Sequence, residues 1–70
     1  MRYAVVIQEV ENSFSAYVPD IPGCVAAGAT LMATETAIRE AITFHLAKLR
    51  GGGLAAPSPL STVEYVVVAA

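Results

Sequence analysis

Apolar positions in the first third of the chain follow the two-residue period of β-strands. Residues 3–10 are rich in β-branched side chains, which pack well on a pleated surface. Residues 14–18 alternate Phe, Ala and Val with Ser and Tyr, so successive side chains should face opposite sides of a sheet. Polar residues 11–13 separate the two segments. The pattern therefore predicts an antiparallel hairpin.

Turn-forming residues then interrupt the pattern at Pro19, Asp20, Pro22 and Gly23. Proline removes a backbone donor, while Asp and Gly favour turns, so the chain must bend here. We expect the Asp20 carboxylate to accept local backbone amides in this turn. A third strand is predicted at residues 24–27.

A helical period replaces the strand pattern over residues 31–50, which contain neither proline nor glycine. Thr30 is predicted to cap the helix, because its hydroxyl can accept from a free amide of the first turn. Three glycines at 51–53 should end it. The predicted buried stripe consists of Leu31, Ile38, Ala41, Ile42, Leu46 and Leu49.

A last apolar segment, residues 62–68, follows a connector that contains Pro57 and Pro59. Its valines and tyrosine predict a fourth strand. An open edge of this kind invites pairing with another strand. The strand could lie beside the first one in the same sheet, or it could pair across a dimer interface. The order βββαβ predicts one α+β domain over residues 1–70, with a small, mainly antiparallel sheet and the helix on one face.

Size and cysteine content favour self-association. A domain of 70 residues buries too little surface to be very stable alone, and a single cysteine cannot form an internal disulfide. The hydrophobic fraction of 56% offers surface for contacts between copies. We therefore expect a homo-oligomer, either a dimer or a tetramer.

Charge and hydropathy exclude several partners and locations. The net charge of −2 and the pI near 5.1 provide no electrostatic footprint for a nucleic-acid backbone. The apolar runs are far shorter than the about 20 residues of a membrane-spanning helix, and no signal peptide is recognisable. We expect a cytoplasmic protein with a reduced thiol.

Residues that could carry chemistry are few. Glu9, Asp20 and Glu40 are the candidates for a metal-dependent nuclease, but their predicted positions do not form the carboxylate cluster that a two-metal site needs. Cys24 is expected to be a small buried side chain, and Gly28 to serve the backbone conformation, as Gly23 does in the turn. We predict no catalytic residue, metal site or cofactor.

A run of features in fixed order resembles the HicB-like antitoxin family over residues 3–59. It comprises the short apolar strand, the stretch Phe14-Ser15-Ala16-Tyr17-Val18, the run Pro19-Asp20-Ile21-Pro22-Gly23-Cys24, the run Ala27-Gly28-Ala29-Thr30-Leu31, and a helix with Glu40-Ala41-Ile42. The resemblance implies a partial RNase H-like fold and a partner protein, the HicA toxin. This toxin family consists of small basic RNA-cleaving proteins.

The chain departs from this family in two places. Ala33 stands where the family commonly has the Glu of a capping box, so Thr30 caps without a reciprocal partner. Many relatives also carry a C-terminal DNA-binding segment, for which this chain has no room before Ala70. We therefore do not expect DNA binding by this chain alone.

The sequence leads to the hypothesis of a non-catalytic antitoxin that covers the active site of a HicA-like toxin. Glu9, Glu11 and Asp20 would steer the encounter with a basic partner, and Ile21 and Pro22 would be apolar anchors. The first alternative is an orphan structural or regulatory domain of the same fold, and the second is a metal-dependent nuclease.

Overall fold

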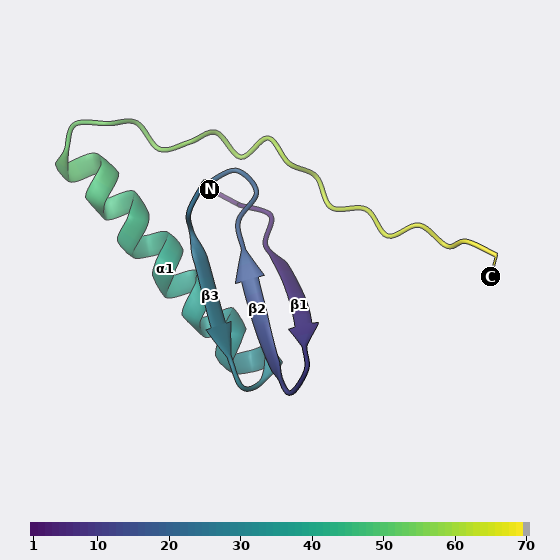
Figure 1. Ribbon diagram of the computed structural model, residues 1–70. Helices are drawn as coiled ribbons and strands as arrows, with labels where there is room; N and C mark the ends of the chain where they lie inside the picture. Colours follow the sequence, from purple (N-terminus) through teal and green to yellow (C-terminus); the bar gives the residue numbers. More distant parts are fainter. Residues whose placement is uncertain (70) are drawn as a thin grey trace.

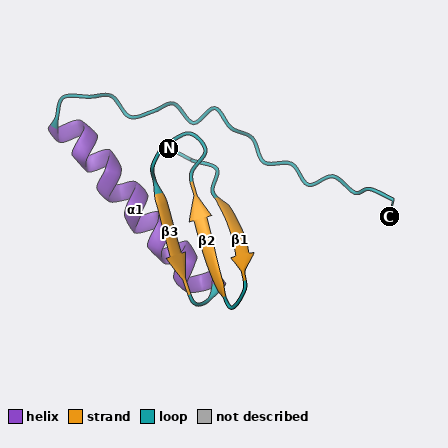
Figure 2. Ribbon diagram, viewed as in Figure 1, coloured by secondary structure: helices purple, strands orange, loops and turns teal. Residues whose placement is uncertain are grey.

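A computed structural model describes residues 1–69 as one antiparallel sheet with one helix packed on one of its faces (Figures 1 and 2). The strands are β1 (Val6–Val10), β2 (Ser13–Tyr17) and β3 (Val25–Gly28), in the spatial order β1-β2-β3. The helix α1 (Leu31–Gly51) follows β3. The predicted α+β class is confirmed. The bounds of β2, β3 and α1 differ from the predicted 14–18, 24–27 and 31–50 by one residue at most.

Strand β1 is shorter than predicted at its start. Val6 pairs with Tyr17, the last residue of β2. Beyond Tyr17 the chain turns toward Pro19, which has no amide to donate, and Val18 donates instead to the carbonyl of Cys24 at 3.2 Å. Residues 3–5 therefore lie next to the sheet without a ladder partner.

The proline-containing loop between β2 and β3 is folded by its own backbone. Ile21 donates to the carbonyl of Val18 at 3.1 Å, and Cys24 donates to the carbonyl of Ile21 at 3.1 Å. Gly23 has a φ of +80°, a left-handed conformation that explains the glycine. Pro19 and Pro22 are exposed, whereas Ile21 is only 1% exposed. Ile21 is therefore part of the core, and its side chain cannot be the surface anchor that we expected.

The predicted N-cap of α1 is confirmed at Thr30. Its Oγ1 accepts from the amide of Ala33 at 3.0 Å, and its carbonyl accepts from the hydroxyl of Thr34 at 2.8 Å. The helix ends at Gly51, and Gly53 takes the left-handed conformation just beyond it. Leu31 is 53% exposed and does not belong to the buried stripe, because it opens the helix ahead of the turn that meets the sheet.

The helix packs off-centre on the sheet. It lies mainly against β3, less against β2 and least against β1. The fully buried core contains Ala16, Val18, Ile21, Cys24 and Ile38. Predicted stripe residues Ala41, Ile42 and Leu46 pack against this core, as do Tyr3, Val5, Ile7 and Ala26.

Gly28 brings α1 close to β3. A Cβ at this position would lie 2.7 Å from Oγ1 and 2.8 Å from the backbone nitrogen of Thr34, and 3.2 Å from the carbonyl carbon of Ala33. Thr34 itself is completely buried. The predicted backbone role of Gly28 is thus confirmed as a requirement for close approach.

The predicted fourth strand is not formed. Residues 54–69 contain no strand, and Figure 1 shows them as an extended trace that leaves the molecule beyond the N-terminus. The order in the single chain is therefore βββα. Residue preferences favoured extended backbone at 62–68, but a strand also needs a paired neighbour, and this segment does not lie along β1.

We predict that Gly28→Ala lowers the free energy of unfolding by about 1 to 3 kcal/mol, because the new methyl group overpacks the β3–α1 contact. Urea denaturation followed by circular dichroism measures this change. Gly51→Ala is the matched control, since nothing lies within 4 Å of its Cβ position. Equal stability of both variants would contradict the close-packing explanation.

Candidate partner-binding surfaces

Two of the predicted partner-binding acids lie at the hairpin end of the sheet. Glu9 is near the end of β1, and Glu11 is in the turn that connects β1 to β2; both are exposed. Glu11 has a φ of +54°, in the left-handed region that favours glycine and asparagine. A glutamate in this conformation costs about 1 kcal/mol. The turn therefore exposes the Glu11 carboxylate in a conformation that lowers the stability of the fold.

Asp20 lies at the opposite end of the sheet, because it follows the last residue of the antiparallel strand β2. Its carboxylate does not hold the local turn as expected. Oδ2 accepts from the amide of Ser61 at 2.8 Å, and Oδ1 accepts from the hydroxyl of Ser61 at 2.8 Å. The structure thus separates Asp20 from Glu9 and Glu11, and gives it a role in fixing the segment after the helix.

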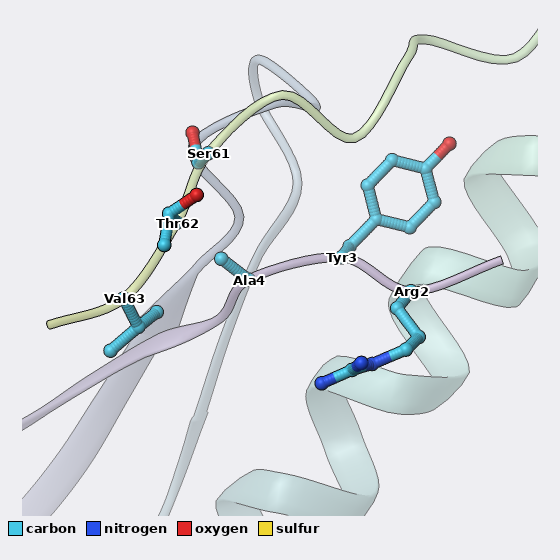
Figure 3. A pocket seen from close by; sticks show the side chains of 6 residues that line it. All are labelled: Arg2, Tyr3, Ala4, Ser61, Thr62 and Val63. Atoms are coloured by element: carbon cyan, nitrogen blue, oxygen red, sulfur yellow. The ribbon is translucent and has the colours of Figure 1, made fainter.

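A third hydrogen bond fixes the same segment at a second point. The hydroxyl of Tyr3 donates to the carbonyl of Pro57 at 2.6 Å. Between the two points the connector runs past the N-terminal residues, and Ser61, Thr62 and Val63 lie beside Arg2 and Tyr3 around a cavity of about 400 Å³ (Figure 3). We call these two interactions, Asp20–Ser61 and Tyr3–Pro57, the tail clamp.

An apolar groove lies between α1 and β1. Its volume is about 370 Å³, and it exists because the off-centre helix leaves the helix-side face of β1 partly uncovered. Glu35 and Arg39 stand at its edge and form an exposed ion pair at 3.4 Å. The other lining residues are Tyr3, Val5, Ile7, Ile38 and Ile42.

Groups that could perform chemistry are dispersed or buried. Among residues 1–69, no three His, Cys, Asp or Glu side chains are placed to hold a metal ion. Cys24 is a free thiol in the core, and desolvation by burial raises its pKa above the ordinary value. In the same part of the chain, no helix is long and apolar enough to cross a membrane.

Comparison with known proteins identifies the family. A model described as "HicB_like antitoxin of bacterial toxin-antitoxin system" matches residues 3–69. The chain belongs to the HicB-like antitoxin family. The match extends past residue 59, where the sequence resemblance ended, and includes the segment that follows the tail clamp.

Two similar proteins support the assignment. One chain of the solved HicA3 and HicB3 toxin-antitoxin complex superimposes with a TM-score of 0.72, at 33% identity, over 86% of this HicB-like chain and 70% of its own length. A 14.9 kDa protein from the rep-hol intergenic region of Haemophilus phage HP1 is 41% identical over 46 residues. That alignment covers 66% of this chain but only 35% of the phage protein, so this HicB-like chain spans about a third of that relative.

We predict that Asp20→Ala releases the segment around Ser61. Both carboxylate oxygens that accept from Ser61 are lost. A hydrogen bond to a charged group contributes about 1.5 kcal/mol or more, and 1.4 kcal/mol corresponds to a factor of ten, so amide exchange at Ser61 should become at least about tenfold faster. Hydrogen exchange followed by NMR measures the rate. Glu11→Ala removes a carboxylate that is distant from Ser61 and should leave the rate unchanged; equal rates in all three proteins would rule out the clamp in solution.

A second prediction concerns Cys24. Because the folded-state pKa is raised, the protonated thiol contributes stability below the unfolded-state pKa, and this contribution is lost as the pH rises through the folded-state pKa. The free energy of unfolding should therefore fall more steeply with alkaline pH in the native chain than in Cys24→Ala. Parallel pH profiles of the two proteins would show that Cys24 does not contribute.

Proposed function

We propose that this chain is an antitoxin that binds a small basic HicA-type RNA-cleaving toxin and covers the site at which the toxin cuts RNA. The similarity to a chain of the HicA3 and HicB3 complex carries the proposal, because 86% of this chain matches a domain found with a toxin in that assembly. The family description supports the same role.

Charge at the hairpin end favours a basic partner. Glu9 and Glu11 are exposed two residues apart, and the whole chain has a net charge of −2. Complementary charge mainly raises the rate of association. The left-handed Glu11 adds to the argument, since backbone strain concentrates where the side chain has a function. We therefore assign the steering role to Glu9 and Glu11.

The other expected contact residues have different roles in this proposal. Pro22 is exposed and stays a candidate anchor, whereas Ile21 supports it from the core. Asp20 contributes through the tail clamp and lies at the far end from the acidic hairpin.

We propose a non-catalytic mode of action. Inhibition by covering a site needs a fixed surface and no reacting group on the antitoxin. Of the three carboxylates considered for a nuclease, Glu9, Asp20 and Glu40, the first two lie at opposite ends of the sheet and cannot share a metal ion in this chain. We also propose that the chain acts in the cytoplasm as a homo-oligomer, where a reduced Cys24 and an RNA-cleaving partner are both compatible with its chemistry.

Mixing the purified chain with a HicA-type toxin tests the proposal. We expect a stable complex on gel filtration and loss of RNA cleavage at equimolar antitoxin. An isolated regulatory domain of the same fold would leave cleavage unchanged and form no complex, which would overturn the antitoxin assignment.

The steering role is tested with Glu9→Gln plus Glu11→Gln. Association measured by surface plasmon resonance should be roughly 3- to 10-fold slower at low salt, and the difference should shrink at high salt. Glu40→Gln plus Glu64→Gln removes the same charge elsewhere and should change the rate less. Equal effects of both pairs would show that net charge, rather than the hairpin, directs the encounter.

A further inference from the structure

The segment beyond the tail clamp has the composition of a strand but no strand partner. Exposed fractions within residues 62–68 reach 93% at Tyr65 and 99% at Val67. Apolar β-forming side chains and unpaired backbone groups that are this exposed attract other strands. We call residues 62–68 the donor segment.

Strand β1 offers a matching edge. Among residues 1–69 only β2 pairs with β1, so the outer edge of β1 has free backbone donors and acceptors in this part of the chain. The groove beside this edge is lined by Val5 and Ile7 from the strand side and by Ile38 and Ile42 from the helix. A strand added to β1 would place every second side chain over this groove.

Alternation in the donor segment fits that requirement. Val63, Tyr65 and Val67 share one face of an extended strand, and Thr62, Glu64, Val66 and Val68 occupy the other. The fully apolar face would cover the groove. The face with Glu64 would point toward the solvent side of the sheet, where Gln8 already lies exposed on β1.

The surface area indicates that part of the chain is left uncovered. A compact monomer of this mass would expose about 4,200 Å², whereas the chain exposes 5466 Å². The excess of about 1,300 Å² is larger than the about 800 Å² that each partner contributes to a standard interface. The radius of gyration, 13.7 Å, likewise exceeds the about 11 Å of a compact chain of this length.

The direction of the donor segment favours a second copy over its own sheet. The tail clamp fixes Ser61, and from there the segment diverges from β1 (Figure 1). Thr62 and Val63 are β-branched and favour continued extended backbone in that direction, and residues 60–69 contain no glycine or proline.

We propose that two copies of the chain exchange their donor segments, each pairing along the β1 edge of the other and covering its groove. Every copy carries one donor and one acceptor, so a two-fold dimer satisfies both and leaves no unpaired donor. This inference specifies how the self-association proposed above occurs, and it is independent of toxin binding.

Light scattering after gel filtration tests the exchange. The native chain should have twice the mass of the 7.3 kDa monomer. Val66→Pro plus Val67→Pro removes two neighbouring amides, one of which must face β1, and should give a folded monomer. Val66→Ile plus Val67→Ile keeps the amides and the β-branching and should remain dimeric. A monomeric native chain, or an oligomer that survives the proline changes, overturns the proposal.

NMR on mixed samples distinguishes exchange from pairing within one chain. When a ¹⁵N-labelled copy is mixed with a ¹³C-labelled copy, isotope-filtered contacts should connect β1 amides of one copy with valine methyls of residues 66–68 of the other. Contacts found only within a copy would show an intramolecular fourth strand and refute the exchange. A dimer that fails to inhibit the toxin would contradict the proposed function while leaving the exchange intact.

Discussion

The close contact between Gly28 and the first turns of α1 determines how the molecule is arranged. Without a Cβ at Gly28, the backbone of Thr34 approaches β3 directly, and the helix lies over β3 and β2. In this off-centre position the helix shields Ala16, Cys24 and Ile38 from solvent in the core. The same offset leaves the β1 side with a groove and an unpaired edge. One missing methyl group therefore determines both the core and the surface that is left to be covered.

Local patterns predicted the elements of the fold because each depends on neighbouring residues. The hairpin followed from alternation, the helix start from the Thr30 hydroxyl, and its end from the glycines at 51–53. The turn at Gly23 was equally readable, since a left-handed residue has few alternatives to glycine. The predicted strand bounds were less accurate. Strand β1 starts at Val6 because Val6 pairs with Tyr17, the last residue of β2, and the sequence of β1 alone does not show where its partner strand ends.

Interactions between distant residues were not predictable in the same way. Asp20 looked like a turn residue, yet its carboxylate binds Ser61, 41 positions away. Ile21 sits between exposed prolines in sequence and still points into the core. The groove depends on the lateral offset of α1, which a helical period does not encode. The segment 62–68 showed the limit most clearly: composition indicates extended backbone, whereas pairing depends on what lies beside it.

The tail clamp has an energetic consequence for any partner that captures the segment after it. Ordering a flexible backbone costs about 1 to 2 kcal/mol of conformational entropy per residue, so a flexible connector would make the free energy of association less favourable. Here Pro57 and Pro59 stiffen the chain, and the bonds from Tyr3 and Asp20 hold it at two points before residue 62. The connector before residue 62 is therefore already ordered when the chain folds, and a partner that binds the residues after it has to order only those residues.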